Sequence, residues 1–552
     1  MSSPNPALVT ARSARRLPRL ALWLLGAAYV LPGLVGRDPW RNADLSAFGL
    51  MAAIAEGRTS WWAPALGGVA ADTALLPHWL GAVFILASQG FLEPALAARL
   101  PFAALLALTL VLVWYSTYLL ARTEAAQPVA FAFGGEAEPV AYARAMADGG
   151  LLAMMASLGL LWLGHETTPE LAQLFAVSLC IYGLAAAPFK PWRSRLALLL
   201  ALPLLAASGA PAMAMAVGAG GWLVCSRSRL APVRNVAWVV VLATVLAALV
   251  AWWLGAWRWR THGLQWDDLP SVARQWLWFM WPAWPLALWT LWRWRQHLLY
   301  RHLAVPWMVL LVALASSLIM GGSDRALMLG LPALAVLAAF ALPTLKRSAS
   351  AAVDWFSMCF FTLAALTGWV LYMSVQTGFP AKPAANVTRL FPGFVPHFSP
   401  LALVLATLAT LAWIWLVRWR TGRHQDALWK SLVLPSGGVA LIWLMLMTLG
   451  LQLVDHARSP KALVVQLQMH LPRGACVAAP GVPPATIAAM EQFGRWRVLA
   501  QTEAANAIGC NHMVRITRQR PLPAAPPGWE LIGEALRTRD REEVTQVFRR
   551  LP

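Results

Sequence analysis

The sequence predicts an all-α, multi-pass membrane protein that carries a small α/β domain after its last membrane span. Three observations lead to this class. Hydrophobic residues make up 59% of the 552 residues, while charged residues make up 12%, about half the share found in soluble proteins. The apolar residues gather in runs that are long enough to cross a bilayer. The basic residues lie in short clusters between these runs, which is typical of cytoplasmic loops.

The net charge of +20 does not indicate a nucleic-acid-binding protein. Such a protein gathers its cations on one soluble face, whereas here they alternate with apolar runs. The clusters are Arg12 to Arg19, Arg193 and Arg195, Arg227 and Arg229, Arg293 to Arg301, Lys346 and Arg347, and Arg418 to Arg423. The 32 tryptophans agree with a membrane protein, because indole rings favour the interface. The five cysteines are scattered and form no metal-ligand pattern.

The apolar runs predict about 13 membrane-spanning helices. The first, 20–36, has no small-residue cleavage site after it and is predicted to stay as a helix with a cytoplasmic N-terminus. Further spans are expected near 97–121, 150–164, 171–188, 195–225, 233–257, 276–293, 304–320, 325–343, 354–374, 399–417 and 433–453. The run 195–225 is interrupted by Ser208, Gly209 and Pro211, which predicts a helical hairpin.

An odd number of spans places the two termini on opposite sides of the membrane. In a bacterial inner membrane, the C-terminus is then periplasmic, and the same count places the basic clusters in the cytoplasm. The stretch 127–148 stays open between a short span and a loop, because it is half apolar and carries Glu136, Glu138 and Arg144. The side on which Asp148 lies depends on that choice.

Three long segments between spans are predicted to be periplasmic. The first, 37–96, contains helical patterns at 44–56 and 74–88, and the second of these fits a surface-lying or re-entrant helix as well as a span. The second segment, 258–275, is polar. The third segment, 376–397, is rich in proline.

The predicted domains are a transmembrane domain over 1–455 and a periplasmic α/β domain over 456–552. In the second domain, short β-type runs at 476–479, 496–501 and 512–517 alternate with helical runs at 461–470 and 485–493. Cys476 and Cys510 both lie in it. A disulfide and two buried free thiols both fit, because the sequence does not fix the distance between them.

Carboxylates at the membrane edge are candidates for function, because burying them is costly. Asp44 stands at the start of the helical pattern 44–56. Its residue type and place fit two roles. It is either the N-cap of that helix, where it accepts backbone N–H bonds, or a catalytic acid or base.

Three stretches of the chain then carry a family resemblance: GRDPWRNADLSAFGLMAAIAEGRTSWWAPALGG, ADTALLPHWLGAVF and ARLPFAALLALTLVLVWYSTYLLAR. They resemble the polyprenyl-phosphate-sugar-dependent glycosyltransferases of the GT-C superfamily, in particular the aminoarabinose transferase and protein mannosyltransferase relatives in families 39 and 83. Asp44 falls on the family's leading acid and Phe48 on its tyrosine, and Asp72 takes the place of a later glutamate. The Arg99-Leu-Pro101 motif is kept.

The chain departs from the family at two lysines. The family's Glu-Lys-Pro-Pro is Asp72-Thr-Ala-Leu75 here, and its Thr-Lys-Gly-Pro is Ser208-Gly-Ala-Pro211. Four arginines are expected to replace these cations at the phosphate of the donor, because a guanidinium binds a pair of phosphate oxygens. They are Arg58, Arg258, Arg260 and Arg325.

The resemblance implies an inverting glycosyltransferase. It would move a sugar from a polyprenyl-phosphate carrier, such as undecaprenyl phosphate, to a lipid, glycan or protein acceptor on the periplasmic face. Asp44 would be the general base, with Asp72 as a second catalytic candidate. Direct displacement inverts the anomeric carbon, so no nucleophilic carboxylate is required.

A divalent metal ion is a further implication of the resemblance. Asp72 and His262 match a carboxylate and a histidine with which relatives hold such an ion, and His165 with Glu166 forms a second candidate pair. Asp148 matches an additional acid in the family's next periplasmic loop. For each of these residues, a polar loop or helix-end residue in water is the alternative.

Two other classes of membrane protein stay open. A transporter or flippase of lipid-linked saccharides should show repeat symmetry and polar residues at mid-bilayer, whereas the ionisable residues here gather at span ends. A non-catalytic scaffold with a GT-C-like fold is favoured by the two missing lysines.

Overall fold

The computed structural model describes residues 7–551 apart from 41, 72–73, 130, 132–133, 258–260, 262, 264, 423–426, 502, 504, 507–508, 519–521 and 537–542. The chain divides into two compact units. The first contains Met1–Pro32, Phe102–Leu366 and Val404–Met445, and the second contains Gly33–Pro101, Thr367–Leu403 and Leu446–Pro552. The domain boundary predicted after residue 455 falls inside the second unit and stays a prediction.

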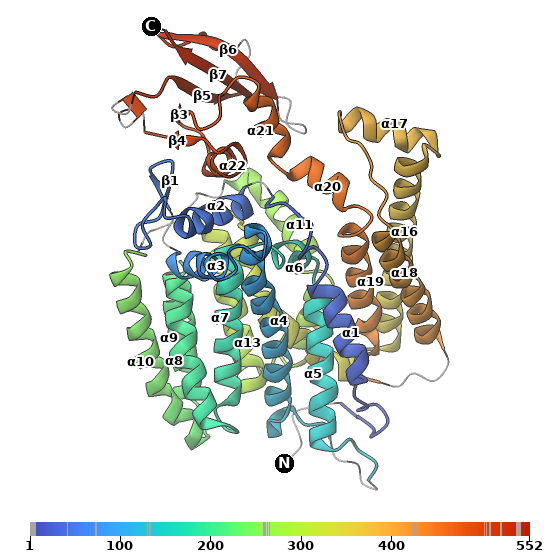
Figure 1. The fold of residues 1–552 in the computed structure, drawn as a ribbon. Helices are drawn as coiled ribbons and strands as arrows, with labels where there is room; N and C mark the ends of the chain where they lie inside the picture. Colours follow the sequence, from blue (N-terminus) through green and yellow to red (C-terminus); the bar gives the residue numbers. More distant parts are fainter. Residues whose placement is uncertain are drawn as a thin grey trace. The chain divides into compact units, whose positions relative to one another are not determined.

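The first unit is built from helices (Figure 1). They are α1 (Arg19–Val30), most of α4 (Pro94–Ala121), α5 (Pro139–Ala156), α6 (Leu158–Leu163), α7 (Pro169–Ala186), α8 (Pro191–Ala207), α9 (Pro211–Ser226), α10 (Ala231–Trp253), α11 (Leu269–Phe279), α12 (Ala283–Arg293), α13 (Arg301–Ile319), α14 (Asp324–Met328), α15 (Leu331–Ala341), and most of α16 (Arg347–Thr377), α18 (Pro400–Thr421) and α19 (Lys430–Leu446). Many begin with proline in the first turn, where its missing N–H costs no hydrogen bond.

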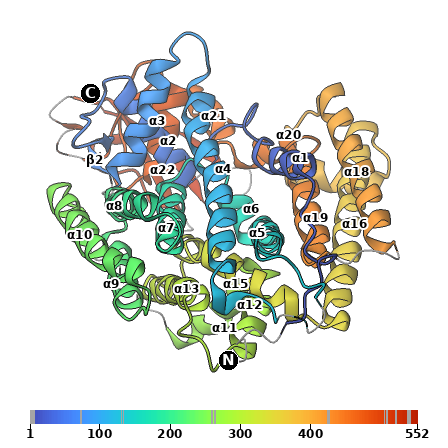
Figure 2. The same cartoon turned by 90° about the horizontal axis from the view of Figure 1, so that it is seen from below.

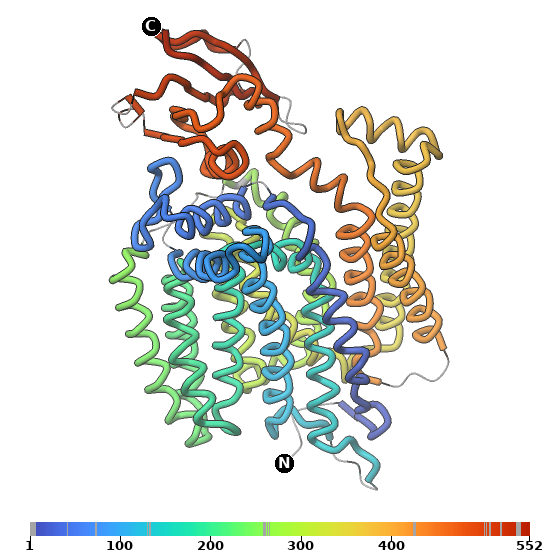
Figure 3. Tube along the Cα trace, viewed as in Figure 1, coloured from blue at the N-terminus to red at the C-terminus, as the bar shows by residue number. Residues whose placement is uncertain are grey.

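The predicted hairpin over 195–225 is confirmed. α8 ends at Ala207 and α9 begins at Pro211, and Gly209 between them has a φ of +89°, a conformation that glycine adopts without strain. The trace in Figure 3 reverses at this point, so that α8 and α9 run side by side. Both pack against α10, and Figure 2 shows the three helices grouped together.

Other expected spans are broken into shorter helices. The span expected over 150–164 breaks at Ser157 between α5 and α6, and the span expected over 276–293 breaks between α11 and α12 at Pro282. Proline lacks the N–H that a continuous helix would use, which explains the second break. The stretch 127–148, for which the sequence left a short span and a loop open, contains both a loop and a helix, since α5 begins only at Pro139.

Six helices among the described residues are long and apolar enough to cross a membrane: α4, α7, α10, α13, α16 and α18. The pair of α19 and α20 (Leu451–Arg458), bent by 70°, is a seventh candidate. Several shorter apolar helices also occur, among them α15, whose residues are all buried. The chain is therefore a multi-pass membrane protein, and the number of about 13 spans stays a prediction.

The second unit contains the helices of the first predicted loop and the C-terminal sheet. Its elements are α2 (Ala43–Ala55), β1 (Ala65–Leu66), β2 (Val69–Ala70), α3 (Leu75–Ala87), α17 (Ala381–Leu390), α20, α21 (Lys461–Gln468), β3 (Cys476–Ala478), α22 (Pro484–Gly494), β4 (Arg497–Leu499), β5 (His512–Thr517), β6 (Trp529–Leu536) and β7 (Val544–Arg550). The sheet order is β4-β3-β5-β7-β6, with β3 parallel to both its neighbours. The strands β6 and β7 were not predicted.

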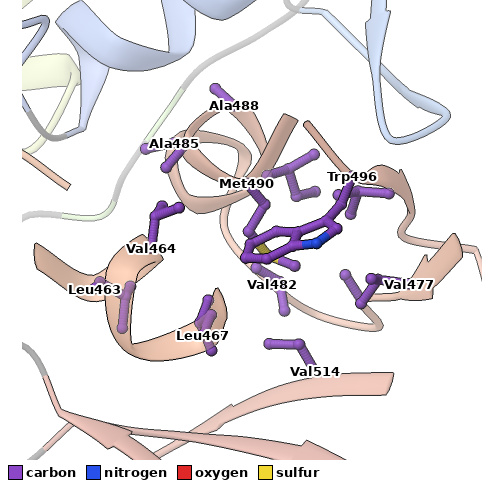
Figure 4. Close-up of a cluster of buried hydrophobic side chains, with 14 of the residues drawn as sticks. Leu463, Val464, Leu467, Val477, Val482, Ala485, Ala488, Met490, Trp496 and Val514 are labelled. Atoms are coloured by element: carbon purple, nitrogen blue, oxygen red, sulfur yellow. The ribbon is translucent and has the colours of Figure 1, made fainter. Parts of the chain in front are cut away.

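One apolar core joins α2 to the C-terminal helices and sheet (Figure 4). Leu467 of α21, Met490 of α22 and Val514 of β5 surround Trp496, whose indole N–H donates to the Pro472 carbonyl at 2.9 Å. α2 packs directly on α22. A Cβ at Gly49 would lie 2.4 Å from the Ala488 Cβ, so glycine is required for this close approach.

The two cysteines of the C-terminal domain form a disulfide between Cys476 in β3 and Cys510 before β5. The structure thus decides between the two alternatives that the sequence left open. The bond lies beside a small apolar cluster that includes Met513 and Phe548.

We predict that Gly49→Ala destabilises the contact between α2 and α22 by about 1–3 kcal/mol, because neither backbone can yield easily. The rate of limited proteolysis of the full-length protein would measure the loss. Ala488→Gly should restore resistance in the double variant. Gly26→Ala is the matched control, since nothing lies within 4 Å of a Cβ there. A double variant as sensitive as Gly49→Ala would contradict the proposed contact.

We predict that replacing Cys476 and Cys510 with serine loosens the C-terminal sheet. The bond spans 34 residues, and loop-closure entropy gives it a worth of about 3–4 kcal/mol. Cleavage within 456–552 by an added protease should accelerate. Cys359→Ser, which removes an exposed free thiol, should have no such effect. Equal cleavage rates in all three proteins would show that the disulfide adds no stability.

Candidate functional site

Asp44 lies in the first turn of α2 and is 1% exposed. α2 begins at Ala43, so Asn42 is its N-cap, and the interpretation of Asp44 as the N-cap is wrong. The Asp44 carboxylate accepts a hydrogen bond from the backbone N–H of Trp40, at 3.1 Å from Oδ2. The same oxygen lies 3.5 Å from Arg37 Nη2 in a buried ion pair. Asp44 is therefore a buried acid that is held by a cation.

Local backbone structure brings Arg37 back to Asp44. The N–H of Leu45 donates to the Trp40 carbonyl at 2.9 Å, which closes a tight turn ahead of α2. Asn42 in this turn has a φ of +72°, which asparagine tolerates better than most residues. A buried charge such as that of Asp44 needs a nearby partner of opposite sign. Arg37, seven positions earlier in the chain, is that partner.

Trp40 links Asp44 to a second acid. Its indole N–H donates to Asp455 Oδ1 at 2.9 Å, and its backbone N–H donates to Asp44. The guanidinium of Arg37 lies 4.6 Å from the centre of the Trp40 ring, and that of Arg458 lies 6.0 Å from it. Two cations near one indole ring add cation–π attraction to the two hydrogen bonds. The orientation of Trp40 is thus fixed from several directions.

Asp38 completes this network. Its backbone N–H donates to Asp455 Oδ1 at 3.0 Å, and its carboxylate accepts from the Ser459 hydroxyl at 2.7 Å. Lys461 Nζ lies 2.6 Å from Asp38 Oδ1. Partial burial lowers the pKa of Lys461, but the hydrogen bond to Asp38 and its charge outweigh this effect and raise the pKa above the ordinary value. The turn before α2 is therefore tied to the connection between α20 and α21.

Arg99 of the Arg99-Leu-Pro101 sequence adds a further buried cation. It lies near the start of α4, is 5% exposed, and donates through Nη1 to the Leu34 carbonyl at 3.3 Å. Its Nη2 has no hydrogen-bond partner among the described residues. The charges of Asp44 and Arg37 both act on it. A buried guanidinium with an unused donor can bind an anion at low desolvation cost.

Arg58, expected to bind the donor phosphate, is engaged by two carboxylates. It forms ion pairs with Glu56 at 2.7 Å and with Glu491 of α22. Burial raises the pKa of Glu491, and the charge of Arg58 offsets only part of that rise. The arginine holds the loop after α2 against the C-terminal helix.

Arg325, in the first unit, is also engaged by carboxylates. Its Nη2 lies 2.5 Å from Glu166 Oε2, and its Nη1 lies 3.3 Å from Glu170 Oε2 and 3.2 Å from the Thr168 hydroxyl. The loop before α7 and the start of α14 are joined in this way. Phosphate binding by Arg325 would require it to exchange these partners.

The pair His165 and Glu166 has structural partners instead of an open metal site. The two ring nitrogens of His165 each lie 2.8 Å from a backbone carbonyl, those of Leu161 and Tyr29, and the ring packs on Trp443 at 4.3 Å. Glu166 binds Arg325 and accepts from the Trp162 indole N–H at 3.1 Å. Both side chains hold helix ends together.

Asp148 lies on α5 and is buried. Its two oxygens accept from the Trp114 indole N–H and the Leu17 backbone N–H, both at 2.8 Å. Leu17 comes just before α1, so Asp148 fixes the start of the first helix. These contacts give Asp148 a structural role beside the N-terminal segment. The sequence alone had left open the side of the membrane on which Asp148 lies.

Four of the predicted site residues lie outside the described residues: Asp72, Arg258, Arg260 and His262. Among the residues that are described, no group of three or more His, Cys, Asp or Glu side chains is arranged to hold a metal ion. The expectation of a metal therefore receives no support from this part of the chain.

Sequence reasoning missed Arg37, Asp38 and Asp455 as members of the Asp44 network. The first two stand in the GRDPWRNAD stretch, where a basic and an acidic residue precede Asp44 within seven positions. That spacing was a usable signal. Asp455 carries no such signal, because it is more than four hundred positions away in the chain.

No protein-family model matches the chain, and no curated protein matches its sequence. Solved structures do match. The likeness is one of fold, and it agrees with the fold that the resemblance in the first loop implied. The chain is similar to ArnT from Cupriavidus metallidurans bound to undecaprenyl phosphate, with 14% identity, a TM-score of 0.56 and 96% of each chain covered. It is also similar to the apo state of the same protein, with 15% identity, a TM-score of 0.58 and 96% of each chain covered.

We predict that Asp455→Ala frees the turn before α2, because the Asp38 and Trp40 donors lose their shared acceptor. Each buried donor left without a partner costs about 1–3 kcal/mol, so amide exchange in 33–42 should quicken roughly tenfold or more. Hydrogen–deuterium exchange with mass spectrometry would measure it. Gln452→Ala is the control on the same helix, since Gln452 binds His397 instead. Unchanged exchange in Asp455→Ala would show that Asp455 does not hold the turn.

Proposed function

We propose that this chain is a glycosyltransferase that moves a sugar from a polyprenyl-phosphate carrier to a lipid, glycan or protein acceptor. The fold supports this kind of function, since the similar ArnT structure contains undecaprenyl phosphate and the alignment covers nearly all of both chains. The observation that carries the proposal is the buried Asp44, which pairs with Arg37 at the position of the family's leading acid.

Asp44 acts as the general base in this proposal. In its ion pair with Arg37, the side chain is a carboxylate, which is the form that can accept a proton. The acceptor hydroxyl gives its proton to Asp44 while its oxygen attacks the anomeric carbon. The bond between that carbon and the phosphate oxygen breaks, and the phosphate leaves with the electron pair. This single displacement inverts the anomeric carbon and needs no covalent intermediate.

The leaving phosphate needs nearby positive charge. Arg99 has an unused buried donor under the influence of Asp44 and Arg37, so we add it to the proposed phosphate-binding residues. Arg258 and Arg260 remain in the proposal. Arg58 and Arg325 each hold two carboxylates, so they can serve only after an exchange of partners.

Asp72 and His262 remain the proposed ligands of a divalent ion, and Asp72 remains the second catalytic candidate. Such an ion would supply positive charge to the departing phosphate. The displacement by the Asp44 base does not depend on such an ion.

The proposed location is a bacterial inner membrane, with the N-terminus in the cytoplasm and the C-terminal domain in the periplasm. The disulfide between Cys476 and Cys510 supports this orientation, because such bonds persist in oxidising compartments. The basic clusters at Arg193, Arg293 and Arg418 support it as well, since cytoplasmic loops are enriched in arginine.

We predict that Asp44→Asn lowers transfer at least about a hundredfold, which is the usual contribution of a general base. Purified protein would be incubated with labelled polyprenyl-phosphate sugars and a membrane extract, and labelled acceptor would be counted. Substituting asparagine keeps the size of the side chain and removes its ability to take the proton.

Asp354→Asn is the matched control, because Asp354, near the start of α16, also forms an ion pair, with Arg420 of α18. It should keep its activity. Normal transfer by a folded Asp44→Asn protein would refute the general-base role. Accumulation of the lipid-linked sugar inside vesicles without labelled acceptor would indicate a transporter. If the protein neither labels an acceptor nor accumulates the sugar, it is a scaffold.

A further inference from the structure

The segment 378–399 between α16 and α18 has an unusual composition. It contains α17, with Lys382 and Arg389, and no Asp or Glu occurs from residue 355 to residue 425. Arg389 donates to Asn386 at 3.2 Å, and neither cation forms an ion pair with a described carboxylate. The segment is therefore a local region of uncompensated positive charge.

The same segment exposes large apolar side chains. Phe379 is 77% exposed, Val395 65%, Phe398 60% and Leu390 57%, whereas Val387 in the middle of α17 is buried. Apolar and basic groups are thus mixed over one short stretch. This combination is typical of helices that lie in the plane of a membrane interface.

The neighbouring helices place this segment at a membrane surface. α16 and α18 are both candidate spans, and α17 turns sharply away from the axis of α16 (Figure 1). Arg418 and Arg420 lie in the last turn of α18, so they are at the opposite end of that span from α17. If that basic end is cytoplasmic, as proposed above, then α17 lies on the translocated side, where Lys and Arg are normally depleted.

Lys382 and Arg389 lie where such residues are normally rare, and no nearby acid in the sequence balances them. We take this as an indication of a phosphate-rich partner. We propose that the segment 378–399 is an interfacial anchor for anionic phospholipids of the outer leaflet. Phe379, Leu390, Val395 and Phe398 insert at the acyl boundary, and Lys382 and Arg389 contact lipid phosphates. The occupant is the bilayer surface itself and not the sugar carrier. The inference rests on the proposed orientation but not on glycosyl transfer.

The test uses full-length protein in nanodiscs. In a Cys359→Ser background, Leu390→Cys is spin-labelled, because the other free cysteines of the described chain, Cys180 and Cys225, are buried. Accessibility to a neutral aqueous nickel complex is compared in phosphatidylcholine and in phosphatidylcholine with about 30% phosphatidylglycerol. We expect accessibility to fall several-fold in the anionic discs, since each cation strengthens surface binding by roughly fivefold. High salt should reverse much of this fall.

The variant Lys382→Gln with Arg389→Gln should abolish the difference between the two lipids. Lys346→Gln with Arg347→Gln, at the other end of α16, is the matched control and should preserve it. Equal accessibility in both lipids, or a full response in the α17 variant, would overturn the proposal.

A third disc contains phosphatidylcholine with a small share of undecaprenyl phosphate. If protection occurs there but not with phosphatidylglycerol, the segment binds the carrier, and the anchor proposal is wrong. None of these readouts measures sugar transfer. Failure of the anchor would therefore leave the glycosyltransferase proposal intact, and inactivity of the enzyme would leave the anchor intact.

Discussion

The hydrogen bonds from Trp40 and Asp38 to a single oxygen of Asp455 hold together the part of the chain on which the proposed chemistry depends. They join the turn before α2 to the helix that leads into the C-terminal sheet. Asp44 takes its position from the same turn, through the backbone N–H of Trp40 and the ion pair with Arg37. The acid is thus placed by contacts between segments that are far apart in the sequence, and a shift of α20 would be felt at Asp44.

The structure holds its arginines in two ways. The half-buried Arg325 and the exposed Arg58 are each balanced by two carboxylates, which leaves little capacity for a ligand. Arg99 is different, because one of its buried nitrogens has no described partner. A cation that is left partly unsatisfied in the folded protein is the better candidate for binding a phosphate, since ligand binding then replaces a missing interaction.

The similarity to ArnT at 14–15% identity has a simple physical basis. Membrane helices need apolar side chains and satisfied backbone groups, and many sequences meet that need. The fold therefore survives extensive substitution, while its chemistry depends on a few polar residues. In the resemblance described above, Asp44 falls on the family's leading acid and two of the family's lysines have no counterpart, so we expect the mode of donor binding to differ from the family's.

Much of this protein was determined by the sequence alone. The apolar runs predicted most of the long helices, Pro211 and its neighbours predicted the hairpin, and short β-type runs predicted β3, β4 and β5. These features depend on local periodicity and on residues that break helices. The N-cap interpretation of Asp44 and the unbroken span over 150–164 were wrong, because one-residue shifts and local breaks leave little trace in composition. Only the tertiary structure decided that Cys476 bonds to Cys510, that Arg58 and Arg325 are held by carboxylates, and that Asp455 reaches Trp40. Such pairings join distant segments, and their energy depends on where each side chain lies in space, which residue spacing does not encode.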